Sequence, residues 1–210
     1  MHLAGHVVLL GDSVFDNAAY VPGGPAVIEH LRRMLPPRWE ATLLAVDGAT
    51  IASVDAQLQR IPQGATHLVL SVGGNDALGY AGFLLTEPTD SFASALAGIA
   101  RIRDEFAREY RAMLDEVRAV GLPLAVCTIY DSIPGLGEAE LAGVSIFNDV
   151  ITRCAFAAGA TLLDLRLISN ESTDYAAVSP IEPSASGGGK IARAIHAALF
   201  HPERGSRVVV

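Results

Sequence analysis

The sequence predicts an α/β protein in which a parallel β-sheet is covered by helices on both faces. Two observations predict this fold class. Half of the 210 residues are apolar and the mean hydropathy is +0.35, as expected where parallel strands are buried on both faces. Short apolar runs also alternate with longer amphipathic stretches, which is the pattern of strands joined by right-handed helical crossovers.

Five short runs rich in Leu and β-branched residues are predicted to be the strands. They are HVVLL, ATLLAV, THLVLSV, PLAVCTIY and ATLLDL, at residues 6–10, 41–46, 66–72, 123–130 and 160–165. Apolar runs of this length, bounded by turn residues, are typical of fully buried strands.

Five helices are predicted around these strands, at residues 25–35, 53–61, 92–120, 138–158 and 186–200. The first begins with Pro25, the second with Ser53 as N-cap, and the long third helix ends at Gly121 and Pro123. No internal repeat, low-complexity tract or linker interrupts the pattern. We therefore expect one domain over residues 1–201, followed by a C-terminal tail at 202–210.

Charge and cysteine content exclude several classes of function. The net charge of −8 and the pI near 5.1 argue against a surface that binds nucleic acid or anionic membranes. Cys127 and Cys154 lie in apolar segments without metal-ligand spacing, which predicts buried thiols. No metal or cofactor is expected.

The N-terminal segment predicts a cytoplasmic protein. It lacks a basic stretch and a cleavage site, and no apolar run reaches the roughly 18 residues of a membrane span. Nothing in the sequence indicates an oligomeric state.

Small polar clusters follow the first four predicted strands. They are GDS, DGAT, GGND and YDSIP, at residues 11–13, 47–50, 73–76 and 130–134. The carboxyl ends of parallel strands share one edge of a sheet, and ligands bind in the crevice beyond that edge. We therefore expect the functional site there.

Ser13, Gly48 and Asn75 carry the groups that stabilise an oxyanion. Ser13 offers a hydroxyl and a backbone N–H, Gly48 a backbone N–H without a side chain, and Asn75 a side-chain amide. Three such donors beside a hydroxyl would form an oxyanion hole for a tetrahedral intermediate. Each cluster alone is equally typical of a turn. Their occurrence at three successive strand ends favours the catalytic interpretation.

These segments resemble the SGNH (GDSL) hydrolases. GDSVFDN, VDGAT and GGNDA are similar in order and spacing to the first three blocks of that family, and IEPSASGGGKIA resembles its last block. The resemblance spans nearly the whole chain. It implies a flavodoxin-like three-layer α/β/α fold and hydrolysis of acyl esters without metal or cofactor. It also implies that Ser13 is the nucleophile and that Ser13 N–H, Gly48 N–H and Asn75 hold the oxyanion.

The last block departs from the family pattern. Where the family has an Asp and a His, this chain has Ser179 and Glu182, when aligned on Pro183. No histidine is well placed to act instead. His6 and His67 are at the start of predicted strands, which places them at the opposite edge of the sheet. His30 and His196 lie on predicted helices that lead away from the site, and His2 and His201 are near the termini. A folded-back tail carrying His201 stays an alternative.

Glu182 is the remaining candidate base. An unperturbed Glu has a pKa of about 4.3 against about 6.5 for His, so it accepts a hydroxyl proton poorly. Burial in its apolar, Pro-flanked turn would raise that pKa. The alternative is a hydrogen bond or salt bridge, for example with Lys190 or Arg193. Further candidate supporting groups near the predicted edge are Asp12, Asp76, Asp174 and Ser179.

The segment at residues 77–92 is apolar for a loop. Its large side chains either line an acyl pocket or lid, or form a helical turn that packs on the core; they are Tyr80, Phe83, Leu84 and Leu85. No basic residue lies near this segment, which favours a neutral ester over an anionic substrate.

The sequence thus favours a serine esterase that acts on small acyl esters through an acyl-Ser13 intermediate, with Glu182 as a weak general base. The alternative is a pseudoenzyme or ligand-binding module that retains the pocket without efficient hydrolysis. A nucleotide-binding or response-regulator domain fits less well, because the first loop lacks a Gly-rich phosphate-binding segment.

Overall fold

A parallel five-stranded sheet forms the centre of the molecule. The computed structural model describes residues 4–201, so His2 and the expected tail at 202–210 lie outside the described residues. The strand order is β2-β1-β3-β4-β5. The strands are β1 (Gly5–Gly11), β2 (Trp39–Leu43), β3 (His67–Ser71), β4 (Leu124–Cys127) and β5 (Thr161–Leu163). All five predicted strands are confirmed, with ends that differ by a few residues.

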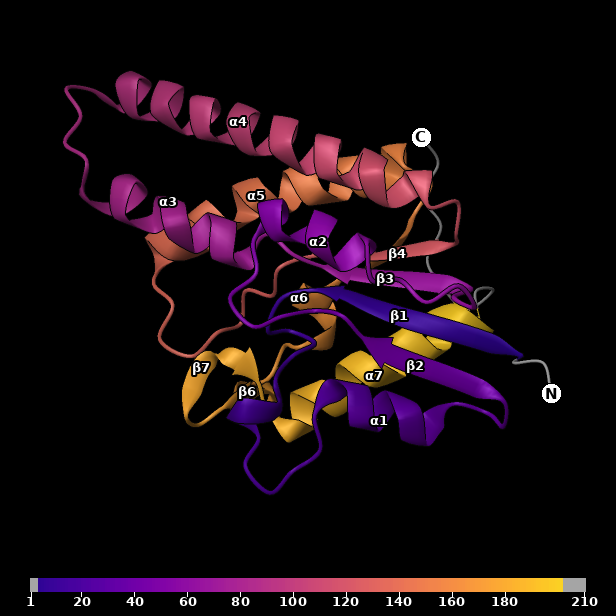
Figure 1. The fold of residues 1–210 in the computed structure, drawn as a ribbon. Coiled ribbons are helices and arrows are strands. Elements are labelled where there is room, and N and C mark those ends of the chain that lie inside the picture. Colours follow the sequence, from indigo (N-terminus) through magenta and orange to yellow (C-terminus); the bar gives the residue numbers. More distant parts are fainter. Residues whose placement is uncertain (1–3, 202–210) are drawn as a thin grey trace.

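Two layers of helices cover the sheet, as Figure 1 shows. One layer contains α1 (Val27–Met34), α6 (Leu165–Ile168) and α7 (Ala185–Phe200). The other contains α2 (Val54–Leu58), α3 (Gly74–Thr86), α4 (Phe92–Ala119) and α5 (Glu138–Ala157). The expected three-layer α/β/α fold is therefore confirmed.

Strand β1 is buried along its whole length because it contributes to both halves of the core. Side chains alternate between the two faces of a strand. Val7 and Leu9 accordingly pack in the cluster beneath α1 and α7, whereas Val8 and Leu10 pack in the cluster beneath α4 and α5. Both cysteines are buried, as predicted.

The strand order places a topological switch point between β1 and β3. From β1 the chain first adds β2 on one side, and then returns to add β3, β4 and β5 in turn on the other. In open α/β sheets the crevice at such a point is where ligands bind. The GDS cluster follows β1 and the GGND cluster follows β3, so both lie at this crevice.

Two elements differ from the sequence prediction. Residues 74–86 form helix α3, in which Tyr80 packs on the core while Leu84 and Leu85 line the cavity described below, so each alternative holds for part of this segment. Its glycines lower intrinsic helix propensity, and packing against α5 compensates for this. A short antiparallel hairpin, β6 (Tyr175–Ala176) and β7 (Ser179–Pro183), also precedes α7. No helix in residues 4–201 is long and apolar enough to span a membrane.

Candidate active site

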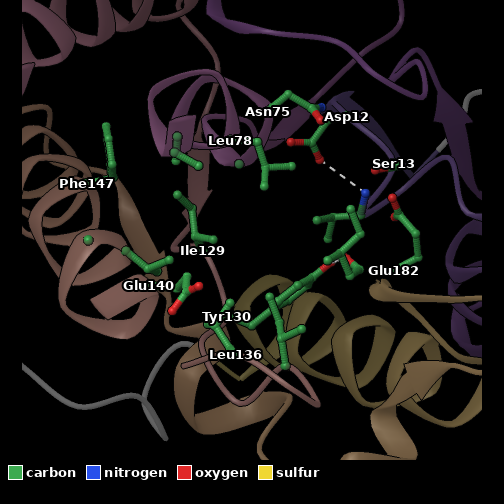
Figure 2. A pocket seen from close by; sticks show the side chains of 18 of the residues that line it. Asp12, Ser13, Asn75, Leu78, Ile129, Tyr130, Leu136, Glu140, Phe147 and Glu182 are labelled. Carbon is green, nitrogen blue, oxygen red and sulfur yellow. Dashed lines mark hydrogen bonds between the residues drawn. The ribbon is translucent and has the colours of Figure 1, made fainter. Parts of the chain in front are cut away.

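A cavity of about 140 Å³ lies beyond the carboxyl ends of β1, β3 and β4. Its polar end contains Asp12, Ser13, Asn75 and Glu182, and the rest of its wall is almost wholly apolar. As Figure 2 shows, the cavity runs from Ser13 and Glu182 past Leu78, Ile129 and Tyr130 towards Phe147. Ser13, Asn75 and Glu182, which come from distant parts of the sequence, therefore line one space.

Ser13 is held at the end of β1 by an unusual backbone. Gly11 has φ of +119°, and a Cβ there would overlap the carbonyl oxygen of Ser71, so only glycine fits. The buried amide of Gln57, on α2, binds this glycine at both ends. Gly11 N–H donates to Gln57 Oε1 at 2.7 Å, and Gln57 Nε2 donates to the Gly11 carbonyl at 2.8 Å. The turn that carries Ser13 is thus fixed from both sides.

The first α-helix after Ser13, α1, begins only at Val27, close to the predicted start. Residues 12–16 instead form one hydrogen-bonded turn, in which Phe15 and Asp16 N–H donate to the Asp12 carbonyl. The α-helix that begins at the site is α3, which follows Gly73, a glycine with φ of +118°.

Glu182 is anchored through the carbonyl groups on either side of it. The Tyr130 hydroxyl donates to the Ile181 carbonyl, and Asn17 Nδ2 donates to the Pro183 carbonyl at 3.0 Å. Asn17 in turn accepts from Val27 N–H at 2.9 Å, which ties the hairpin to the start of α1. Because both neighbouring peptides are fixed, the Glu182 side chain is directed at Ser13 (Figure 2).

Burial changes the acidity of Glu182. Only 5% of its surface is exposed, and Oε2 is buried without a hydrogen-bond partner among the described residues. Desolvation raises its pKa from 4.5 to about 7, against the lowering effect of a hydrogen bond from Ser13, with Asp47 adding to the rise. The pKa of this carboxyl is therefore close to that of a free imidazole.

Asp12 is a second buried carboxyl at the same end of the cavity. Its Oδ1 accepts from Val14 N–H at 3.1 Å, the bond drawn in Figure 2. Burial raises its pKa to about 8, and the nearby charges of Glu182 and Asp76 contribute to the rise. At neutral pH, Asp12 is thus mainly protonated, and Glu182 is the carboxyl that ionises first.

Asn75 and Asp76 connect α3 to the loop that carries Gly48. Asn75 Nδ2 donates to the Ala49 carbonyl at 2.9 Å, and Asp76 accepts from Ile51 N–H at 3.1 Å. Gly48 has φ of +75°; it is exposed and does not itself line the cavity. Asp76 therefore supports the geometry of the loop, and the second N–H of Asn75 is available to a ligand.

Asp174 and Ser179 do not line the cavity. Asp174 is 1% exposed and binds Lys190 Nζ through Oδ2 at 2.8 Å. Lys190 also binds Glu171, so the salt bridge considered for Glu182 is instead made with two other carboxylates. Asp174 is an anchor for the start of α7, and Ser179 is the half-buried first residue of β7.

No histidine of residues 4–201 lines the cavity. His6 and His67 lie near the amino ends of β1 and β3, as expected. His30 Nε2 donates to the Ala185 carbonyl at 2.8 Å. His201 follows α7, whose last turn packs on Trp39 at the start of β2, so it lies at the opposite edge of the sheet. Within the same residues, no group of three His, Cys, Asp or Glu side chains could hold a metal ion.

The sequence match decides the family. A model of the GDSL-like lipase/acylhydrolase family matches residues 9–202. The chain belongs to this family. The predicted resemblance and the predicted class of enzyme, a carboxylic ester hydrolase, are therefore confirmed. No curated protein matches the chain significantly.

Solved structures of lipases and esterases share the fold. A lipase from a goat rumen metagenome has a TM-score of 0.73 at 17% identity, with 93% of this chain and 97% of that chain covered. An extracellular lipase from Streptomyces rimosus has a TM-score of 0.68 at 19% identity, covering 93% and 100%. The acetylxylan esterase Axe2 from Geobacillus stearothermophilus has a TM-score of 0.68 at 15% identity, with 98% of this chain and 99% of that chain covered.

In this GDSL family member, Gln57 was missed by the sequence analysis, and the supporting roles of Asn17 and Tyr130 were not foreseen although both lie in the quoted segments GDSVFDN and YDSIP. Asn17 and Gln57 are polar side chains that are almost fully buried, at 0% and 3% exposure. A buried amide must find partners, so a Gln on the apolar side of α2 was the signal available for Gln57. The partners of Asn17 and Tyr130 lie 166 and 51 residues away in sequence, and no local pattern indicates them.

Proposed function

We propose that this protein is a serine esterase that hydrolyses small, neutral acyl esters through an acyl-Ser13 intermediate, with Glu182 as the general base. The observation that carries the proposal is the juxtaposition of Ser13 and a buried Glu182 at the polar end of one apolar cavity. Family membership supports the reaction class, and the raised pKa of Glu182 supports its assignment as base.

In the acylation step, the Ser13 hydroxyl proton passes to ionised Glu182 as Ser13 Oγ bonds to the ester carbonyl carbon. The negative charge that develops on the carbonyl oxygen is stabilised by the backbone N–H of Ser13 and by the Asn75 amide, both at the cavity, whereas Gly48, the third expected donor, does not line it. The tetrahedral intermediate then collapses. The bond to the alcohol oxygen breaks, and protonated Glu182 returns the proton to the leaving alkoxide.

Deacylation repeats the same steps with water. Glu182 takes a proton from the water, whose oxygen bonds to the acyl carbon, and the Ser13–acyl bond breaks as Ser13 regains its proton. No metal or cofactor is required in either half of the reaction. Asp12 lines the polar end as a mainly protonated supporting group, and Asp76 holds the Gly48 loop.

Glu182 takes the position of the family's histidine, and its basicity at pH 7 supports this role. With a pKa of about 7, a substantial fraction of it is ionised at pH 7. Among residues 4–201 it has no salt-bridge partner, and Lys190 binds Asp174 and Glu171. The second candidate function is a ligand-binding module. The observation that favours it is the lack of histidine along the cavity within residues 4–201.

Covalent labelling separates the two candidates. A fluorophosphonate probe should label Ser13 of the wild-type protein, and Ser13→Ala should lose both labelling and hydrolysis of p-nitrophenyl esters. The Ser145→Ala variant, which changes an exposed serine on α5, is the matched control and should behave like the wild type. A wild-type serine that stays unlabelled for hours would favour the binding module. The cytoplasmic location expected from the sequence stays a prediction.

A further inference from the structure

The cavity has a polar end and a long apolar end, and these ends are suited to different parts of an ester. The apolar end lies between helices α3 and α5. One of its lining residues is Phe147, which is 2% exposed and packs edge-on against Phe106 at a ring distance of 4.9 Å. Leu78 and Leu84 of α3 line this end together with Gly143 and Val144 of α5, and Leu84 Cδ1 lies 3.8 Å from a Cβ built on Gly143. Such a wall offers dispersion contacts to a hydrocarbon chain and no partner for a polar group.

The charges along the cavity exclude anionic groups. Its titratable side chains are Asp12, Glu182, Tyr130 and, at the far end, Glu140; no Lys, Arg or His lines it among the described residues. An acyl group with a terminal carboxylate or phosphate would therefore meet only acidic or neutral side chains in a poorly hydrated space. The wall selects an uncharged chain.

The polar side of Glu182 is suited to the alcohol. Glu182 must lie next to the leaving oxygen, because it returns a proton to it. Asp47, whose charge reaches Glu182, accepts a hydrogen bond from Tyr20 at 2.7 Å, and this exposed polar pair is outside the cavity. With the alcohol on the side of Tyr20 and Asp47, the acyl chain extends the other way, between α3 and α5.

We infer that the apolar end of the cavity is an acyl-chain subsite for an unbranched, uncharged acyl group of about six carbons, and that Gly143 sets the permitted length. This inference rests on the proposed function and deepens it. The volume of about 140 Å³ belongs to the whole cavity, including its polar end, and a cavity of about 150 Å³ accommodates the six carbons of benzene. The six carbons therefore include the carbonyl carbon at Ser13.

Gly143 is the residue at which the length of the subsite can be changed. A Cβ built on it would meet Leu84 Cδ1 at 3.8 Å, which is ordinary contact, so alanine fits. A leucine at this position would extend into the space between α5 and α3 and shorten the subsite. Gly82, on α3, has nothing within 4 Å of a built Cβ and is exposed. Gly82→Leu is therefore the matched control for Gly143→Leu.

The test compares p-nitrophenyl esters from acetate to decanoate. In the wild type, kcat/KM should rise about threefold to fourfold per added methylene up to hexanoate and level off by octanoate. Gly143→Leu should lower the hexanoate value about tenfold or more and leave the acetate value near that of the wild type. Gly82→Leu should match the wild type throughout, and Leu84→Ala should extend the rise to longer chains. A flat acyl series, or equal losses for acetate and hexanoate in folded Gly143→Leu, would overturn the inference.

A second ester series tests the orientation. Ethyl acetate and hexyl acetate vary the alcohol at constant acyl group, and Gly143→Leu should affect both alike. A loss confined to hexyl acetate would overturn the assignment of the subsite to the acyl group.

A binding measurement separates this inference from the proposed function. In Ser13→Ala protein, methyl hexanoate should displace the neutral fluorophore N-phenyl-1-naphthylamine. Adding Gly143→Leu should lower the affinity for methyl hexanoate, measured by this displacement, about tenfold. If fluorophosphonate fails to label Ser13 but this binding pattern holds, the proposed function is wrong and the acyl-chain subsite stands. If Ser13 is labelled while displacement is insensitive to Gly143→Leu, the subsite is wrong and the proposed function stands.

Discussion

Lys190 Nζ lies 2.8 Å from Asp174 Oδ2, and the carboxylate that it neutralises is almost completely buried. Lys190 therefore does not pair with Glu182, which precedes it by only eight positions in the printed sequence, and Glu182 has no salt-bridge partner in the described part of the chain. Lys190 and Asp174 hold the start of α7, whereas Glu182 faces Ser13. Within one short segment, Asp174 is therefore a structural carboxylate that binds Lys190, and Glu182 is the carboxylate proposed to act in catalysis.

Lys190→Met should destabilise the protein without affecting the chemistry at Ser13. The change leaves the buried Asp174 carboxylate unpaired, and an uncompensated buried charge strongly disfavours the folded state. We expect a lower urea midpoint at pH 7 and partial recovery in the Lys190→Met, Asp174→Asn double variant. The control Arg153→Met breaks only an exposed ion pair with Asp149 and should change the urea midpoint little. Lost activity with unchanged stability would show instead that Lys190 serves the active site.

Ester hydrolysis should increase with pH through the ionisation of Glu182. The base must be ionised to accept the Ser13 proton, and its pKa is about 7, so kcat/KM should rise between pH 5 and pH 8. Glu182→Gln should lower kcat/KM about 10²–10⁴-fold and remove this rise. The control Glu140→Gln, which changes a cavity carboxylate on α5, should keep the wild-type profile. Full turnover in Glu182→Gln would refute the assignment of the base.

The same substitution should stabilise the protein at alkaline pH. Because the folded-state pKa of Glu182 is raised, the folded state binds the proton more tightly, and stability falls as pH rises from 4.5 to about 7. Glu182→Gln avoids that loss. Above pH 7 it should raise the free energy of unfolding by up to about 3 kcal/mol, with little change below pH 4.5. Urea unfolding at pH 4 and pH 8 measures this, with exposed Glu116→Gln as control; equal effects at both pH values would contradict it.

Tyr130→Phe should impair catalysis more than stability. It removes the hydroxyl that holds the Ile181 carbonyl beside Glu182, at a cost of about 1 kcal/mol in unfolding free energy. A small displacement of the base should lower kcat about 10–100-fold. Tyr175→Phe is the matched control, because its hydroxyl binds the Ser169 carbonyl away from Glu182. If both variants lose activity equally, Tyr130 does not position the base.

Much of the fold could be predicted because its signal is local. Buried parallel strands such as β1 and β3 are continuous apolar runs, and the GDS and GGND clusters mark their ends. Helix α3 was predicted only as one of two alternatives. Its glycines weaken the helical pattern, and contacts with α5, far away in the sequence, stabilise it.

The candidate site could be predicted in composition but not in geometry. Ser13, Asn75 and Glu182 were each identified from strand ends or from the family blocks, and all three line one cavity. Asp174 was expected near them and is instead bound to Lys190. Gln57 was overlooked because its role is to make two hydrogen bonds to Gly11, which lies 46 positions away in the sequence.

By itself, the sequence determined which residue types stand at the carboxyl edge of the sheet, because strand periodicity and turn chemistry act over a few residues. Only the tertiary structure decided that Glu182 is desolvated beside Ser13, and that apolar side chains of α3 and α5 line the same cavity. Desolvation depends on every element that excludes water from a group, and a sequence does not specify those elements until it is folded.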